Sequence, residues 1–409
     1  MKILFWNDCK WRVRTKGNLI GRCMGLDPST NAAGKGGEKT ISAKKQFGLS
    51  VNSITFAMAH LAIILVVSLL VWNVFADPKQ GIWKLYPQPF GAVMFWFVLE
   101  VVFLAFNGEL WPFQRLKQPL AGLVAFVTGT ALAFLTVGIL VYGIGSFEPA
   151  FNPSGAGWTA TGMIVLMGFY FFGILPTNMG HWPWVDLGLK QPWVGIIEFF
   201  EGFFLAFLGY LVLIYPSVAS WSQSGKVILP LVTAVGWFYS VIVSWLTTAN
   251  ALDNWPWSRL GSRAKMALGS LFGNFVIGTG IYFLFLALLK NFLIPVEAQK
   301  SLGVAITMWP AQLGVCILFW VLTWATVFDN QLLNTVSKKV VRVVITYGLG
   351  LITFWVYTRW FAISVLHEAE ISKGFGGDPL TWMDLMILVM LIYAVYFGSY
   401  GLIKKTNKV

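Results

Sequence analysis

The chain has 409 residues, of which 57% are hydrophobic and only 11% are charged, with a net charge of +12 and a mean hydropathy of +0.70. A soluble domain carries about 25% charged residues, so this composition excludes an ordinary water-soluble enzyme or binding domain. Uncharged stretches of about 20 residues recur, and each can cross a bilayer as a helix. The sequence therefore predicts an all-α, polytopic helical membrane protein in contact with the lipid bilayer.

Residues 1–48 form a basic N-terminal segment that we expect to lie outside the membrane, on the cytoplasmic side. An apolar stretch begins only near Ser50, so no cleavable signal peptide is predicted. The excess of positive charge is better explained by contact with anionic lipid head groups than by binding of nucleic acid. The three cysteines give no disulfide framework and no metal-binding spacing.

Residues 49–404 are predicted to form a single transmembrane domain with ten spans. These are expected at about 50–76, 90–108, 119–144, 158–177, 192–216, 227–249, 265–289, 303–327, 341–364 and 381–403. With the N-terminus inside, 22 of the 29 Lys and Arg residues fall on the cytoplasmic side, six fall on the other side, and Arg359 lies within a span. This excess predicts that both termini are cytoplasmic, in what we expect to be a bacterial or archaeal cytoplasmic membrane.

A Trp-Pro-aromatic step recurs along the chain at intervals of 71 and 73 residues. Its copies begin at Trp111, Trp182 and Trp255, and Asp329-Asn330 marks a fourth, degenerate copy. Each step lies between two apolar stretches, so the repeated unit is a hairpin of two spans. We expect four tandem parallel two-helix repeats, at about 90–144, 158–216, 227–289 and 303–364, flanked by one helix at each end (about 50–76 and 381–403).

Polar residues gather where these hairpins reach the cytoplasmic side. The set comprises Asn107, Glu109, Asn178, His181, Asn250, Asp253, Asn254, Asp329 and Asn330. They have two interpretations: helix caps and turn formers for the connecting loops, or a shared binding ring at the cytoplasmic face. The tryptophans of the repeat are typical of the lipid–water boundary.

Four polar groups, His60, Glu100, Glu201 and Asn274, stand roughly ten residues inside a predicted span, and about 15 Å of helix places them near mid-bilayer. Glu198 lies one turn from Glu201. Because charges inside a bilayer are costly, we consider all five as candidates for coupling a proton or a substrate. The alternative is that each is a neutral, hydrogen-bonded group that holds helices together; this is the favoured interpretation for Asn274 and for Glu198, which lies nearer the surface.

No catalytic motif and no metal or cofactor signature is present, so the sequence favours a protein that is not an enzyme and specifies no cofactor. We expect a proton-coupled secondary transporter or channel for a small solute. The alternative is a membrane subunit of a quinone-linked redox complex or of an assembly complex, which would bind other membrane or peripheral subunits. A lipid-modifying enzyme that uses the cytoplasmic polar ring is a third interpretation, but it lacks a recognisable nucleophile.

Overall fold

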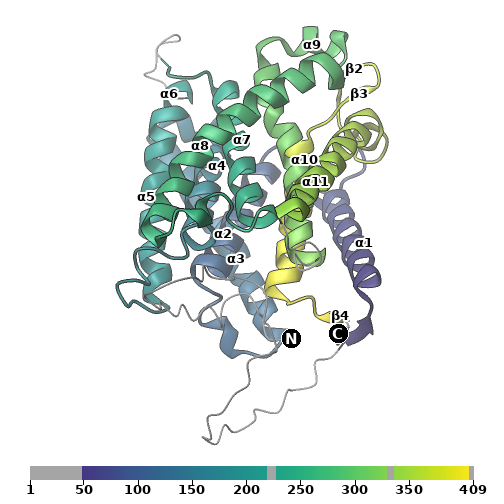
Figure 1. Ribbon diagram of the computed structural model, residues 1–409. Helices are drawn as coiled ribbons and strands as arrows, with labels where there is room; N and C mark the ends of the chain where they lie inside the picture. Colours follow the sequence, from purple (N-terminus) through teal and green to yellow (C-terminus); the bar gives the residue numbers. More distant parts are fainter. Residues whose placement is uncertain (1–47, 219–226, 329–335, 405–409) are drawn as a thin grey trace, which may run out of the picture.

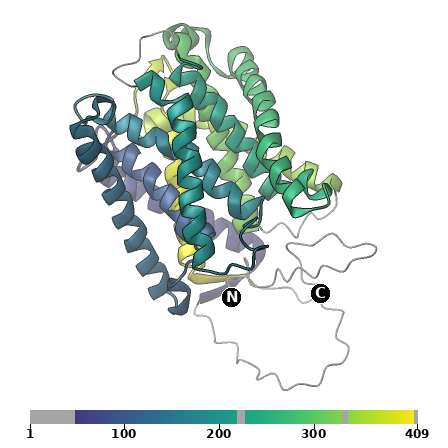
Figure 2. The same ribbon diagram turned by 90° about the vertical axis from the view of Figure 1, so that its left-hand side faces the viewer.

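The computed structural model describes residues 48–218, 227–328 and 336–404. Within these ranges, ten helices are long and apolar enough to cross a membrane, in agreement with the sequence prediction. Figures 1 and 2 show these helices packed into one bundle, and the contacts between them define an inner ring and an outer ring. The fold is therefore that of a multi-pass helical membrane protein.

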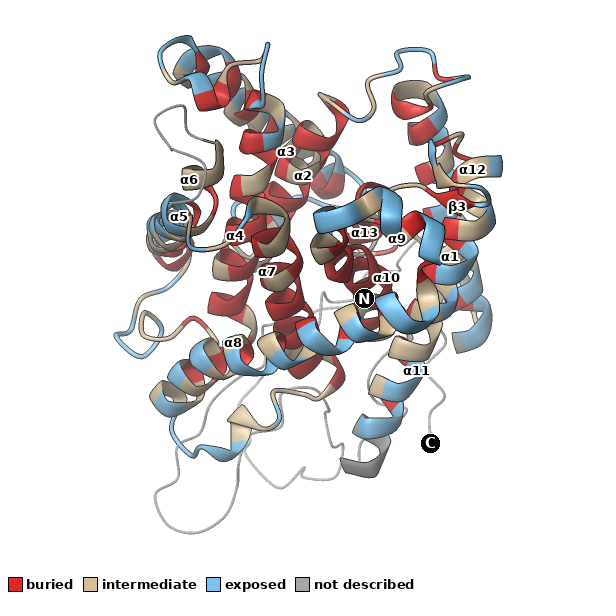
Figure 3. Cartoon of the chain, turned by 90° about the horizontal axis from the view of Figure 1, so that it is seen from above, coloured by how far each residue is buried: buried red, intermediate tan, exposed pale blue. Residues whose placement is uncertain are grey.

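The inner ring consists of every second span of the described chain. Its helices are α2 (Phe90–Val102), α4 (Gly157–Thr177), α7 (Leu231–Leu246), α10 (Trp309–Thr323) and α13 (Pro379–Leu391). Each packs against the next, and α13 packs against α2, which closes the ring. In these spans 67% to 78% of the residues in the most apolar window are buried, and the view from above shows them as the buried centre of the molecule (Figure 3).

The outer ring consists of the alternate spans. Its helices are α1 (Ser53–Val71), α3 (Leu120–Gly138), α5 (Trp193–Leu213), α8 (Arg263–Leu288) and α11 (Val336–Val356). Helices α3, α5, α8 and α11 each pack on the inner helix that precedes them, and α1 packs on α13. Only 22% to 33% of their apolar windows are buried, so their remaining apolar side chains are the surface that contacts lipid.

Most of the spans end in a single wider, π-helical turn. These turns are η1 (Trp72–Ala76), η2 (Phe103–Asn107), η4 (Ile139–Gly143), η7 (Thr247–Ala251), η9 (Leu289–Leu293), η11 (Trp324–Phe328), η13 (Tyr357–Phe361) and η14 (Ile392–Tyr396). Short helical turns make up much of the connections: η3 (Phe113–Arg115), η5 (Ile144–Ser146), η6 (Pro149–Phe151), α6 (Tyr215–Val218), η8 (Trp257–Arg259), α9 (Val296–Leu302), η10 (Gly303–Met308) and α12 (Ala362–Ser364).

Two short strand pairs mark the two ends of the bundle. Strand β1 (Gly48–Val51) pairs in parallel with β4 (Gly401–Lys404) at the end of the bundle where the described part of the chain begins and ends, which we call the terminal face (Figure 1). Strand β2 (Glu370–Ser372) pairs with β3 (Phe375–Gly376) at the opposite end, the distal face. The first span therefore begins later and the last span ends earlier than predicted, because the flanking residues form β1 and β4.

Glycines let outer helices approach inner helices closely. A Cβ atom on Gly278 of α8 would lie 2.5 Å from the Cα of Val241 in α7, and one on Gly350 of α11 would lie 2.7 Å from the Cα of Ile317 in α10. Such small residues are the usual means of close helix contact in membranes, where the surrounding lipid gives no hydrophobic force between helices.

Two glutamines fasten outer helices to the ends of inner helices. Gln118, just before α3, donates from Nε2 to the carbonyl of Tyr396 at 2.7 Å. Gln191, just before α5, donates in the same way to the carbonyl of Asn107 at 2.7 Å. Helix α3 is therefore held to the end of the α13 span. Helix α5 is held in the same way to the end of the α2 span. The first and last spans, predicted to flank the hairpins, therefore lie together and complete the two rings.

Candidate functional site

The described inner spans end at the terminal face in a recurring turn. Two successive residues adopt positive φ in Glu109-Leu110, Gly180-His181, Asp253-Asn254 and Gly398-Ser399. The N–H of the second residue donates to the carbonyl six residues earlier, at 2.8 to 2.9 Å in each case. This cap satisfies carbonyls that a helix end leaves free. It gives Glu109, His181, Asp253 and Asn254 a structural role that is independent of any ligand.

Glu198 of α5 lies at the centre of a buried polar cluster near this face. Its side chain is fully buried, with Oε1 2.9 Å from Nδ1 of His181, while Oε2 accepts a hydrogen bond from Nδ2 of Asn107 at 2.9 Å. The Asn107 amide also donates to the carbonyl of Phe172. We call Asn107, His181 and Glu198 the Glu198 cluster. It joins the ends of the α2 and α4 spans to the outer helix α5.

Glu109 lies at the rim of this cluster, where its Oε1 is 3.7 Å from Nε2 of His181 and its side chain is about one-third exposed. Burial raises the pKa of Glu109 above its ordinary value; the nearby Glu198 adds to this effect, while His181 and the amide of Gln191 oppose it. His181 is therefore placed between two carboxyl groups, one buried and one that reaches the surface.

The remaining residues of the predicted polar ring fall into two further groups. Asn178 donates from Nδ2 to Oδ1 of Asn254 at 2.6 Å, which links the ends of the α4 and α7 spans. Asp253 pairs with Nζ of Lys339 at 3.0 Å and with Nη1 of Arg342 at 3.3 Å, which links the end of α7 to α11. Asp329 and Asn330 lie outside the described residues, and Asn250 lies in η7, at the end of the α7 span.

His60 and Glu100, two of the predicted coupling residues, both lie beside η14, the last turn of the α13 span. The fully buried His60 ring packs 4.6 Å from the ring of Tyr393, and neither of its nitrogens has a hydrogen-bond partner among the described residues. Glu100 of α2 is buried near Tyr396 and interacts with it electrostatically. Both residues therefore face the α13 span from neighbouring helices.

Glu201 and Asn274 occupy different surroundings. Glu201 is half-buried, and its Oε2 accepts a hydrogen bond from Nε1 of Trp184 at 2.8 Å, so it is tied to the second Trp-Pro-Trp step. Asn274 of α8 accepts from the hydroxyls of Ser244 in α7 and Thr248 in η7, at 3.0 and 3.2 Å. The described contacts bring Glu198 together with His181 and Asn107. Glu201 contacts Trp184 instead, and His60 and Glu100 lie beside η14.

Asp384, which the sequence analysis did not select, lies at the centre of the inner ring. Its carboxyl accepts one hydrogen bond, at 3.3 Å, from the hydroxyl of Tyr239 in α7. It borders a cavity of about 40 Å³ whose other walls are mostly apolar side chains of α2, α4 and α7, such as Val98 and Leu166. Since the cavity touches four of the inner helices, it lies on the axis of the ring.

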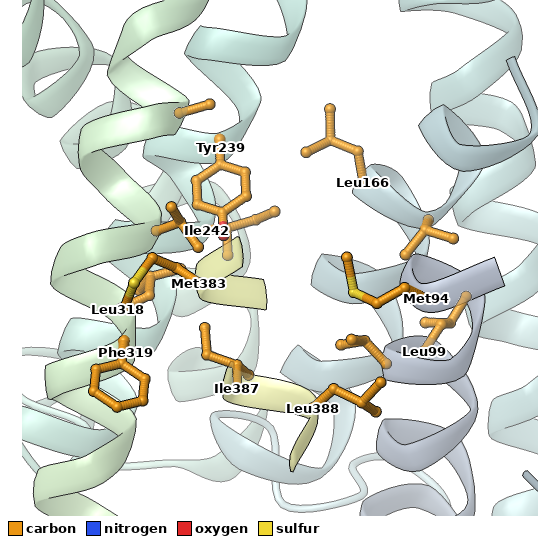
Figure 4. Packing of buried hydrophobic residues seen from close by; sticks show 14 of the residues in the cluster. Met94, Leu99, Leu166, Tyr239, Ile242, Leu318, Phe319, Met383, Ile387 and Leu388 are labelled. Atoms are coloured by element: carbon orange, nitrogen blue, oxygen red, sulfur yellow. The ribbon is translucent and has the colours of Figure 1, made fainter. Parts of the chain in front are cut away.

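Buried apolar side chains from all five inner helices, including Met94, Leu318 and Leu388, pack in the interior of the ring (Figure 4). A cavity of this volume holds roughly three water molecules. Asp384 is therefore a carboxyl group enclosed in the membrane-spanning region beside a space that water can occupy.

A second polar network lies at the distal face, at the start of α13. Glu368 accepts from the hydroxyl of Tyr357 at 2.9 Å and from the N–H of Asp378 at 2.6 Å. Asp378 in turn accepts from the amide of Gln312 at 2.9 Å and from the hydroxyl of Thr381 at 2.6 Å. Nearby, Asp77 at the end of the first span lies 2.8 Å from Nδ1 of His367.

An open cleft of about 510 Å³ gives solvent access to this distal network, and Lys79, Tyr86, His367 and Glu368 contribute to its lining. Burial and the neighbouring Asp378 raise the pKa of Glu368 to about 8, against the hydrogen bonds that it accepts. The sequence carries one signal for this network, the dense run of polar residues at 365–380 between the last two predicted spans.

Among the described residues, no three His, Cys, Asp or Glu side chains come together in a way that could hold a metal ion. No protein-family model, no curated protein and no solved structure is significantly similar to this chain.

Proposed function

We propose that this chain is a proton-coupled secondary transporter or channel for a small solute, with its path along the axis of the inner ring and Asp384 as the group that binds the proton. In this proposal the terminal face is cytoplasmic, as the distribution of Lys and Arg in the sequence favours. The four hairpins derive from tandem duplication, and the first and last spans form a fifth pair of one inner and one outer helix.

The observation that carries the proposal is the setting of Asp384. A carboxyl group inside a membrane is costly unless it is paired or has a role in moving ions. Asp384 is 9% exposed, its one hydrogen bond comes from a neutral hydroxyl, and no described cation pairs with it. Such a group can gain and lose a proton without breaking an ion pair, provided that water reaches it through the cavity.

The closed axis supports a transporter more than an open pore. The cavity beside Asp384 has a volume of only about 40 Å³, and the buried side chains of Figure 4 fill the interior of the ring, so a solute passes only if the inner helices move apart. Coupling follows if protonation of Asp384 changes the free energy of that movement.

Proton flux in vesicles tests the proposal. The purified chain is reconstituted with a pH-sensitive dye inside, a proton gradient is imposed, and cationic, neutral and anionic small solutes are added in turn. We expect one class to accelerate decay of the gradient in the wild type, and the Asp384→Asn variant to lose this acceleration by about a hundredfold, the scale of losing a positioned acid or base.

Glu297→Gln provides the matched control, because Glu297 is an exposed carboxylate on α9, outside the inner ring. Equal flux in the wild type and Asp384→Asn would remove Asp384 from the mechanism. If the chain moves no protons alone but copurifies with a peripheral redox protein at fixed stoichiometry, the membrane-subunit interpretation is the better one.

A further inference from the structure

Glu368 occupies the boundary between the distal cleft and the protein interior. It lines the cleft, yet it is only 5% exposed, and its two carboxyl oxygens accept hydrogen bonds from the hydroxyl of the buried Tyr357 and from the N–H of the half-buried Asp378. Its neighbour Glu370 also lines the cleft but is exposed, and it accepts only from the N–H of Gly374. The two acids therefore differ in whether they connect to the interior.

From Glu368, polar groups continue inward to the start of α13. The N–H of Asp378 donates to Glu368, and the carboxylate of Asp378 accepts from the hydroxyl of Thr381 at 2.6 Å. Thr381 and Asp384 are three residues apart on α13, which is about 4.5 Å of helix rise. The axial cavity is lined by Leu380 as well as by Asp384, so it runs along this same turn.

We propose that the distal cleft is where protons enter the path and that Glu368 is the uptake group that supplies Asp384. This inference rests on the proposed function, since it assigns Asp384 its source of protons. A proton from water in the cleft binds the Glu368 carboxylate and moves through a water molecule to the carboxylate of Asp378, because the Asp378 N–H that joins the two residues cannot carry it onward. The Thr381 hydroxyl then accepts it and releases its own proton, through water in the cavity, to Asp384. Each donor is reset by the next proton.

The charged and titratable groups around Glu368 favour this role. They are Tyr357 of η13, Asp378 before α13, Tyr86 from the segment between the first two spans, His367 with its partner Asp77, and Lys79 and Glu370, which line the same cleft. No described Lys or Arg forms a salt bridge with Glu368, Asp378 or Asp384. With a pKa of about 8, Glu368 holds a proton at neutral pH and can donate it inward.

Time-resolved infrared spectroscopy tests the inference with the full-length chain in lipid nanodiscs. Photorelease of a proton starts the reaction, and the C=O band of protonated Asp384 is identified as the one that Asp384→Asn removes. In Glu368→Gln, which keeps an oxygen acceptor for the Asp378 N–H, we expect this band to rise about tenfold more slowly or worse. In Glu370→Gln we expect the wild-type rate.

Thr381→Val is a second variant that preserves side-chain shape and removes only the hydroxyl, and it too should slow the band. An unchanged rate in both Glu368→Gln and Thr381→Val, with folding confirmed by thermal unfolding, would overturn the inference and leave the proposed function standing. If wild-type protein shows no Asp384 band at any pH between 5 and 9, the proposed function itself fails.

Discussion

The Glu198 cluster and the Asp384 cavity are two solutions to the same problem, a carboxyl group buried in an apolar bundle. Glu198 has an amide donor at 2.9 Å, a histidine nitrogen at 2.9 Å, and no exposed surface. Asp384 has one hydroxyl donor at 3.3 Å and a cavity at its side. Glu198 joins three elements of the fold. Asp384 has few contacts, so a change in its charge breaks few interactions.

This difference separates a structural acid from a candidate for function. A buried carboxylate with strong donors stabilises the fold because removing it leaves those donors unsatisfied. A buried carboxyl group with weak donors contributes little to stability, so its presence requires another explanation. Burial alone therefore does not identify a coupling residue; the number and kind of its donors do.

The sharpest test of this contrast is the removal of Glu198. In Glu198→Leu, the Asn107 amide and the His181 ring lose their acceptor inside the protein. We expect a loss of about 3–5 kcal/mol in the free energy of unfolding, measured by SDS titration in mixed micelles. Glu201→Gln is the matched comparison on the same helix and should cost about 1 kcal/mol, because only the bond from Trp184 is affected. Equal losses in the two variants would contradict the distinction.

The pH dependence of stability is expected to show the next largest effect, through Glu368. Its folded-state pKa of about 8 exceeds its ordinary value of 4.5, so the folded state binds the proton more tightly than the unfolded state. This contribution to stability is complete below about pH 4.5 and is lost as the pH rises to about 8. The unfolding temperature should therefore fall between pH 5 and 9, and it should fall less in Glu368→Gln. A parallel fall in both proteins would refute this role.

A smaller effect is expected where the rings are fastened. Gln118→Ala and Gln191→Ala each remove the hydrogen bond to the carbonyl at an inner-helix end, together with a local bond accepted from the N–H of Gly122 or Gly195. Each should cost about 1 kcal/mol of unfolding free energy, and the two losses should be similar. A much smaller loss in Gln118→Ala would mean that the last span is held less firmly in the ring than the second span is.

The smallest change in stability is expected for Asp384→Asn. Asparagine keeps an acceptor for the Tyr239 hydroxyl and removes the cost of burying an ionisable group. The unfolding temperature should stay the same or rise by a few degrees, although proton flux is lost. A marked decrease would show that Asp384 has a structural role like that of Glu198.

The spans themselves were predictable, because length and hydropathy are enough to define them. The third span was expected at 119–144 and lies at Leu120–Ser146, and the fourth was expected at 158–177 and lies at Gly157–Thr177. The division into inner and outer rings was not predictable from periodicity. Lipid and neighbouring helices are both apolar, so the two faces of a helix such as α1 do not differ in hydrophobicity.

The candidate site was only partly predictable for the same reason. Glu198 and Glu201 are one turn apart, and depth along the helix favoured Glu201, yet the rotation of α5 buries Glu198 and leaves Glu201 half-buried. Asp384 was missed because the predicted span began at residue 381, which placed it near an edge. The span begins at Pro379, and its first turn is enclosed by Gln312 and the distal network.

The closed ring described here has an odd number of members, α2, α4, α7, α10 and α13, and so it cannot be divided into two equal halves. Carriers built from paired bundles expose their substrate by rocking one half against the other. In the proposed transporter, a path along the axis would therefore open when one inner helix moves away from the other four. We expect α13 to be this helix. It packs on α1 in the outer ring, and β4, which follows it, pairs with β1, so both contacts are made to the opposite end of the described chain.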